Sequence, residues 1–99
     1  MDVAAEDFDW DAGNRDKCQK HGVSIAEIEA LLRGTPRVAP DLKHRAMEER
    51  FLAVGRNERG RPLFVVFTLR VKDGQRLIRP VSARYMHREE IEGYEAEAS

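Results

Sequence analysis

The spacing of apolar side chains predicts one strong helix, which covers residues 25–33. Ser24 stands at the N-cap position and Glu27 follows three residues later, which is the capping-box pattern of a helix start. The apolar face of this helix consists of Ile25, Ile28, Leu31 and Leu32. Gly34 ends the pattern, as glycine commonly does after a helix.

Weaker patterns precede that helix. Asp7–Trp10 alternates acidic and aromatic residues, which suits a short strand whose Phe8 and Trp10 pack into the core. The polar segment Ala12–Lys20 is long enough for a short helix, and Gly22 can end it in the left-handed conformation. We therefore expect a strand and a short helix before the strong one.

Beyond residue 49 the apolar period becomes two, the period of a strand. Three such segments follow one another: Arg50–Gly55, Pro62–Arg70 and Arg76–Arg84. Residues 57–60 and Asp73-Gly74 separate them, and Asp-Gly is favoured in type I′ hairpin turns. The middle segment is apolar on both faces, which predicts a central strand covered on both sides. Pro80 lacks an N–H group, so we expect an edge or a bulge at that point of the last strand.

The remaining segments complete the expected chain. Thr35–Glu49 carries two prolines and little periodicity, which predicts an extended piece at Arg37–Ala39 followed by an irregular loop. Near the C-terminus, Ile91 and Tyr94 stand at helical spacing and predict a short last helix with both facing inward. We expect a single α+β domain over residues 1–99, with the N-terminal helices on one face of an antiparallel sheet.

The net charge of −1 conceals acidic ends and a basic middle. Between residues 56 and 84, seven of the eight basic residues are arginines, and only Glu58 and Asp73 oppose them. Local fields, rather than net charge, attract a polyanion. The middle of the chain is therefore the expected binding surface.

The single cysteine, Cys18, cannot form an internal disulfide. Neither a signal peptide nor an apolar run of membrane length is present, so we expect a soluble cytoplasmic protein without membrane association. His21 lies three residues after Cys18, but a structural zinc site needs four ligands and the other histidines lack a matching spacing. We therefore expect a small buried thiol and no metal or other cofactor.

Five blocks of the sequence, taken in order, resemble the BrnT family of bacterial toxins. They are DFDWD, KHGVSIAEIEALL, EERFLAVGRN, GRPLFVVFTLR and IRPVSARYMHREEIEGYE. The resemblance implies a RelE-like fold, ribonuclease activity and neutralisation by a BrnA-like antitoxin in a type II toxin–antitoxin system. It also implies a complex that contains two copies of the toxin and two of the antitoxin.

A ribonuclease that uses no metal ion lets the 2′-OH of the RNA attack the adjacent phosphodiester. It needs a base for that hydroxyl, a cation for the developing charge and an acid for the leaving oxygen. Arginine suits the second task, because its planar fork meets two phosphate oxygens. We expect catalytic residues among Lys20, His21, Glu49, Arg50, Arg70 and Arg84, and RNA contacts from Arg56, Arg61, Arg79 and Ser82. The resemblance favours roles for Lys20, Arg70 and Arg84.

The strand period assigns some of these side chains to faces. It places Ser82 and Arg84 on the same face as Ile78, and Arg79 on the opposite face. Arg70 shares a face with Thr68 in the preceding strand.

Structural alternatives remain open for several candidates. His21 could cap the carbonyls of the preceding helix instead of moving a proton. Glu49 and Arg50 are expected to form an exposed ion pair, although Glu49 could also be the base. The arginines beside the first hairpin turn, Arg56, Arg59 and Arg61, fit solvated charges equally well. The two tyrosines, Tyr85 and Tyr94, are expected in the core rather than against an RNA base.

The basic middle also fits a second class of protein. A non-catalytic RNA-binding module, or a regulatory toxin homologue without activity, would need the same cations. Growth arrest on expression, reversed by the neighbouring open reading frame, separates the toxin from this alternative.

Overall fold

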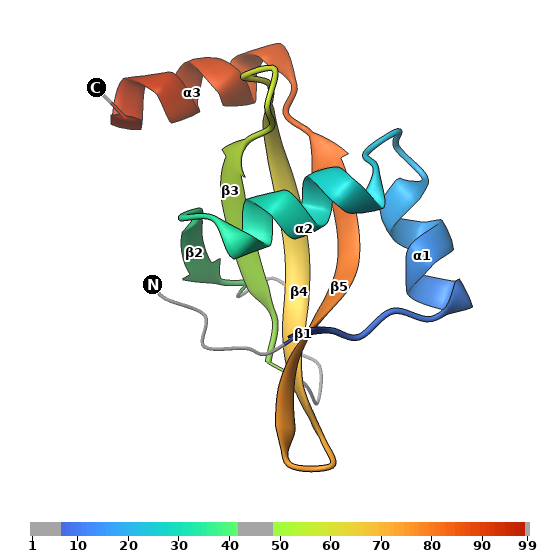
Figure 1. Ribbon diagram of the computed structural model, residues 1–99. Coiled ribbons are helices and arrows are strands. Elements are labelled where there is room, and N and C mark those ends of the chain that lie inside the picture. Colours follow the sequence, from blue (N-terminus) through green and yellow to red (C-terminus); the bar gives the residue numbers. More distant parts are fainter. Residues whose placement is uncertain (1–6, 42–48, 99) are drawn as a thin grey trace.

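The computed structural model describes residues 7–41 and 49–98, which form three helices and a five-stranded sheet of order β1-β5-β4-β3-β2. The strands are β1 (Asp7–Phe8), β2 (Arg37–Pro40), β3 (Phe51–Arg56), β4 (Pro62–Lys72) and β5 (Gln75–Tyr85). The helices are α1 (Ala12–Gln19), α2 (Ile25–Arg33) and α3 (Arg88–Ala98). Figure 1 shows α2 crossing one face of the sheet, α1 beside β5, and α3 at the end of the sheet where β5 finishes.

The α+β prediction is confirmed, and the predicted elements are present within the described ranges. Strands β2 to β5 are antiparallel, as expected, but β1 pairs in parallel with β5 and makes the sheet mixed. The predicted extended piece after α2 is β2, whereas the irregular loop predicted next falls mostly on residues 42–48, outside the described residues.

Local hydrogen bonds explain where the first two helices begin and end. The side chain of Ser24 accepts from the N–H of Glu27, and the Glu27 carboxylate accepts from the N–H of Ser24, so the capping box is complete. Asp11 and Asn14 form the same arrangement at the start of α1. Gly22 ends the first helical segment with a φ of 87°, a conformation that favours glycine.

The first two helices cover one face of the sheet. Leu63, Val65 and Phe67 alternate along β4, are fully buried, and share a core with Ile28 of α2. The helix comes so close to β3 that a Cβ atom added at Gly55 would collide with a Leu31 methyl group. A larger residue at that position would therefore require the Leu31 side chain to move.

The opposite face of β4 is only half covered, so the prediction of a strand covered on both sides is wrong for this face. Phe64 and Val66 are half-buried rather than buried. We call this surface the open face; it consists of the side chains of β3, β4 and β5 that point away from α1 and α2. An apolar strand face that stays accessible is available for binding.

Strand β5 contains the predicted irregularity at Pro80. Ser82 pairs with Val66 and Pro80 pairs with Phe67, so Val81 has no opposite residue in β4 and forms a β-bulge. Ile78 pairs with Leu69 and is buried on the helix side, whereas Ser82 lies on the open face.

A buried amide fastens α1 to the strands beside it. Asn14 is 6% exposed, and its Nδ2 atom donates to the carbonyl oxygens of Asp9 and Pro80, both at 2.9 Å. Each buried polar group of this kind needs its partner, because desolvation without one is costly. Asn14 therefore fixes the helix against β5.

The C-terminal helix is attached mainly through charged side chains. Arg37 and Arg56 both lie over the Tyr94 ring, 5.1 and 5.2 Å from its centroid. The prediction that Tyr94 is a core residue is therefore wrong. Arg37 also pairs with Glu97, and Arg56 with Glu95. None of the described helices is long and apolar enough to cross a membrane.

Candidate functional site

Several predicted site residues gather on the open face. Directly paired residues of antiparallel strands point to the same side of a sheet. Arg84 pairs with Phe64, and Ser82 pairs with Val66. Ser82 and Arg84 therefore stand on a surface whose neighbouring side chains are apolar.

The prediction that Arg79 lies opposite Ser82 and Arg84 is wrong. The bulge at Val81 adds one residue between them, which reverses the alternation. Arg79 pairs with Thr68 and belongs to the open face. The same shift separates Ser82 and Arg84 from Ile78, which the strand period alone had grouped with them.

A cavity of about 570 Å³ lies on this face. Its lining includes His21, Leu52, Phe64, Ser82, Arg84 and Glu90. His21 comes from the turn between α1 and α2, and Glu90 from α3. Three predicted site residues therefore line one cavity, although they come from distant parts of the sequence.

Arg84 and Glu90 form the best-defined charged pair of the cavity. Both terminal nitrogens of Arg84 donate to the carboxylate, one to each oxygen, at 2.8 Å. The Arg84 guanidinium also lies 4.6 Å from the centroid of the Phe64 ring. The hydrogen bonds from Arg84 and from the N–H of His87 lower the pKa of Glu90 from 4.5 to about 2.

His21 and Lys20 are exposed, but they face different surroundings. His21 lines the cavity of Arg84, whereas Lys20 lines a separate shallow hollow with Gly13, Asp16 and neighbouring residues of α1. The structure therefore brings His21, and not Lys20, together with Arg84.

Arg50 and Glu49 precede β3, next to the Thr68 position of β4. The predicted ion pair between Glu49 and Arg50 is wrong, because the salt bridges of the described residues do not include it. Instead, the main-chain oxygen of Glu49 accepts a hydrogen bond from the Thr68 hydroxyl at 2.7 Å. The Nε atom of Arg50 is buried and has no hydrogen-bond partner. Arg70 lies two residues beyond Thr68 on the same face of β4.

Arg79 is held by acidic residues near the N-terminus. Its two terminal nitrogens lie 3.4 Å from Asp9 and 2.9 Å from Asp11, and Lys72 reaches Asp9 from β4. The Asp9 side chain is 8% exposed, so the cluster is partly withdrawn from solvent. Arg79 thereby ties β5 to the segment between β1 and α1.

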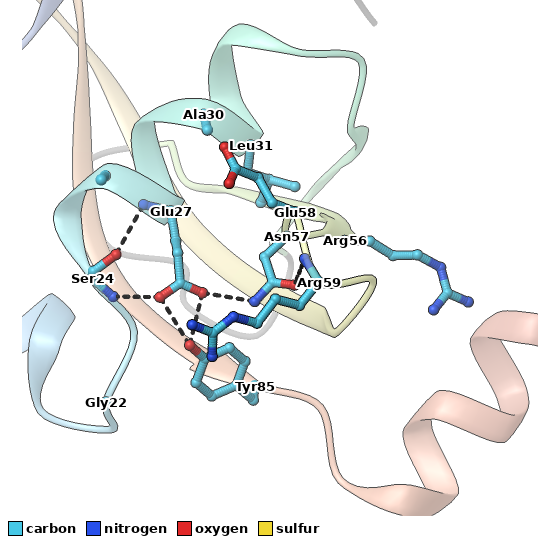
Figure 2. Close-up of a pocket in the computed structure, with 11 residues that line it drawn as sticks. Gly22, Ser24, Glu27, Ala30, Leu31, Arg56, Asn57, Glu58, Arg59 and Tyr85 are labelled. Atoms are coloured by element: carbon cyan, nitrogen blue, oxygen red, sulfur yellow. Dashed lines mark hydrogen bonds between the residues drawn. The ribbon is translucent and has the colours of Figure 1, made fainter.

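A second cavity, of about 700 Å³, lies between the start of α2 and the β3–β4 turn (Figure 2). At its centre the Glu27 carboxylate accepts hydrogen bonds from the Tyr85 hydroxyl, at 2.7 and 2.9 Å, and from Asn57 Nδ2 at 2.9 Å. Burial alone would raise the pKa of Glu27, but the hydrogen bonds from Asn57, Tyr85 and Ser24 outweigh it and lower the pKa to about 2. Tyr85 packs against the core, as predicted, and also lines this cavity.

Two predicted RNA contacts stand beside this second cavity. Arg61 lies over the Tyr85 ring, 3.7 Å from its centroid. Arg56 donates to the Gly60 carbonyl at 2.7 Å, and Figure 2 shows its side chain pointing away from Glu27. Neither lies in the cavity of Arg84, so the predicted RNA contacts are spread over two surfaces of the molecule.

Sequence reasoning missed Glu90, Glu27 and Asn57. Glu90 follows His87 by three residues and could have been recognised as a capping carboxylate at the start of α3. Glu27 was recognised only as a cap, because its contact with Tyr85 spans 58 residues. Asn57 was assigned only to the hairpin turn.

The described residues contain neither a reactive thiol nor a cluster of metal ligands. Cys18 is fully buried, and burial raises the pKa of its thiol to about 11. Within residues 7–41 and 49–98, no three His, Cys, Asp or Glu side chains are grouped so that they could hold a metal ion.

The sequence matches the model of a known protein family. The model of a family described as "Ribonuclease toxin, BrnT, of type II toxin-antitoxin system" matches residues 10–90. The matched range includes the charged residues that line both cavities, from His21 to Glu90. No curated protein matches the sequence.

Proposed function

Since the chain belongs to the BrnT family of ribonuclease toxins of type II toxin–antitoxin systems, we propose that it cleaves RNA without a metal ion, by attack of the RNA's own 2′-OH. We place the reaction in the open-face cavity that His21, Ser82 and Arg84 line. The arrangement of helices and sheet is expected to be RelE-like, as the resemblance implies.

The observation that carries this proposal is the meeting of His21 and Arg84 in one cavity. An imidazole can accept or donate a proton near neutral pH. A guanidinium stays charged and offers a fork that matches two phosphate oxygens. Together they supply the base and the cation that 2′-OH attack requires.

The remaining predicted residues are assigned supporting roles. Ser82 contributes a hydroxyl beside Arg84. Arg50, with its unpaired buried Nε atom, and Arg70 lie further along the open face and extend the positive surface that a phosphate chain can follow. Glu49 stays a second candidate for the base. The other four, Lys20, Arg56, Arg61 and Arg79, are assigned to RNA contacts outside the cavity.

The proposal is tested by the cleavage reaction itself. The purified chain is expected to cut a single-stranded RNA in excess EDTA and to leave a 2′,3′-cyclic phosphate. It is not expected to cut the same sequence when the sugar at the cut site lacks its 2′-OH. If EDTA abolishes cleavage, or if the 2′-deoxy substrate is cut equally well, this mechanism is wrong.

The partner is proposed to be a BrnA-like antitoxin. The family to which the chain belongs implies an antitoxin partner. The open face of the chain offers apolar Leu52, Phe64 and Val66 beside arginines. An antitoxin segment with apolar and acidic side chains fits such a surface and would block RNA access. We propose a complex with two copies of each chain, whose mass light scattering measures.

The alternative, a non-catalytic RNA-binding or regulatory homologue, is favoured by one observation. Arg79 and Arg84 already pair with carboxylates of the same chain, which compete with phosphate for both. RNA binding without any cut product, and expression without growth arrest, would support this alternative.

A further inference from the structure

We propose that His87 is the general acid that protonates the leaving oxygen, and that Glu90 is the residue that positions it. The inference rests on the proposed function and completes its chemistry, because cleavage needs an acid as well as a base. Neither the sequence pattern nor the family description assigns a role to either residue.

The positions of three side chains carry the inference. The Nδ1 atom of His87 lies 3.7 Å from Glu90 Oε1. The same oxygen accepts from Arg84 Nη1 at 2.8 Å, and the other oxygen accepts from Arg84 Nη2 at 2.8 Å. One carboxylate therefore holds a phosphate-binding fork and an imidazole in a single cluster.

The backbone strengthens this arrangement. The main-chain N–H of His87 donates to Glu90 Oε1 at 2.8 Å, which fixes the residue at the start of α3. Because Nδ1 faces the carboxylate, Nε2 lies on the far side of the ring. The side chain is 80% exposed, so a substrate oxygen can reach that atom. Pairing of one imidazole nitrogen with a carboxylate orients the ring and selects which nitrogen exchanges protons.

The neighbouring groups cannot supply the proton themselves. Arg84 stays protonated throughout the useful pH range. Glu90 is ionised at neutral pH and has no proton to give. His21 lines the cavity of Arg84 and Glu90 from the turn between α1 and α2 and is left to act as the base. His87 directly precedes α3 and stands beside that cavity through Glu90, which lies 3.7 Å from its Nδ1 atom and pairs with Arg84 of β5.

The resulting reaction is balanced. His21 takes the proton of the 2′-OH while the 2′-oxygen forms its bond to phosphorus. The bond from phosphorus to the 5′-oxygen breaks, and His87 gives its proton to that oxygen. The products are a 2′,3′-cyclic phosphate and a 5′-hydroxyl, and water restores both histidines to their starting forms.

A substrate with a sulfur leaving atom tests the role of His87 directly. The cut site of the wild-type chain is first mapped on ordinary RNA, and the bridging 5′-oxygen at that site is then replaced with sulfur. A thiolate leaves without protonation. His87→Gln should therefore lose about 10²-fold in the rate of cutting ordinary RNA, the scale of one general acid, and regain most of that loss on the sulfur substrate.

Two variants serve as controls. His21→Gln should lose activity on both substrates, because a base is still needed when sulfur leaves. Arg88→Gln, which removes an adjacent cation outside the cluster, should resemble the wild type. The pH–rate profile adds a second readout: the fall in rate at high pH should disappear in His87→Gln, and Glu90→Gln should shift it.

The outcomes separate this inference from the proposed function. One outcome is that the wild type cuts both substrates while His87→Gln keeps its full rate on both, or loses rate equally on both. In either case His87 is not the acid and the cleavage proposal still stands. If the wild type cuts neither substrate, the proposed function itself fails, and this inference fails with it.

Discussion

At the scale of single residues, Arg84 combines two tasks that draw on the same guanidinium. It lines the open-face cavity, where we propose that it binds a phosphate, and it also holds Glu90 at the start of α3 with two hydrogen bonds. A substituted side chain therefore affects both RNA cleavage and the attachment of the helix.

Arg84→Ala is expected to lower the cleavage rate by roughly 10²-fold or more, the effect of removing one preorganised donor to the transition state. Arg84→Lys keeps the charge but not the fork, so it should recover only part of the activity. Initial rates and melting temperatures of both variants provide the measurement. Full activity in both Arg84→Ala and Arg70→Ala would contradict the assignment of the site to the open face.

Glu27 gives a prediction about acid stability. Its pKa is about 2 in the folded protein, against 4.5 for a free side chain. A depressed carboxyl pKa stabilises the folded state above the free value, and this contribution is lost as the pH falls from about 4.5 towards 2. Unfolding midpoints in urea should therefore fall less steeply over this range in Glu27→Gln than in the wild type. The matched control, Glu58→Gln, removes an exposed carboxylate from the same cavity rim; if it behaves like Glu27→Gln, the Tyr85 and Asn57 hydrogen bonds are not the cause.

The sequence allowed prediction where the determinants were local. The capping box at Ser24 and the Asp73-Gly74 turn each involve residues a few positions apart, and both predictions are confirmed. The pairing of Arg84 with Phe64 depends on the register of two strands. The contact between Glu27 and Tyr85 depends on the packing of the whole fold, which no short pattern contains.

At the scale of elements, the two faces of β4 differ in burial although both are apolar. Phe67 is fully buried on the helix side, whereas Phe64 is half-buried on the open face. The sequence could not distinguish them, because alternation identifies the faces but not which face a helix covers.

This difference predicts unequal effects of the same substitution. Phe67→Ala should lower the free energy of unfolding by about 3–5 kcal/mol, the usual cost of removing a buried phenyl ring. Phe64→Ala should cost distinctly less, because the ring retains contact with solvent. Chemical denaturation of both variants measures the difference. Equal losses would show that the open face is packed as tightly as the core.

At the scale of the whole molecule, the acidic ends of the sequence fold back onto its basic middle. The pairs are Asp9 and Asp11 with Arg79, Glu90 with Arg84, Glu95 with Arg56, and Glu97 with Arg37, which itself lies in β2. The charge asymmetry visible in the sequence is thus partly an internal complementarity, a role that composition alone did not reveal.

Binding of the antitoxin should depend on the charges that remain accessible on the open face. The association rate with the product of the neighbouring open reading frame should fall as the salt concentration rises, because screening weakens steering between opposite charges. Arg50→Gln should slow association, whereas Arg76→Gln, at the far tip of the β4–β5 hairpin, should change it little. Stopped-flow rates at several NaCl concentrations measure this; rates that do not respond to salt would exclude the open face as the charged docking surface.

The bulge in β5 has a genetic consequence. Because Val81 is one residue more than β4 can pair with, loss of the Val81 codon would leave a regular strand in which Ser82 and Arg84 still belong to the open face. Strand β4 has no extra residue of this kind. Loss of one codon from its middle would therefore move every later side chain of the strand to the opposite face. Cells that express the chain without Val81 and without an antitoxin should therefore stop growing, whereas cells that express a chain with one residue deleted from the middle of β4 should survive. This part of the gene can shorten during evolution without loss of the site.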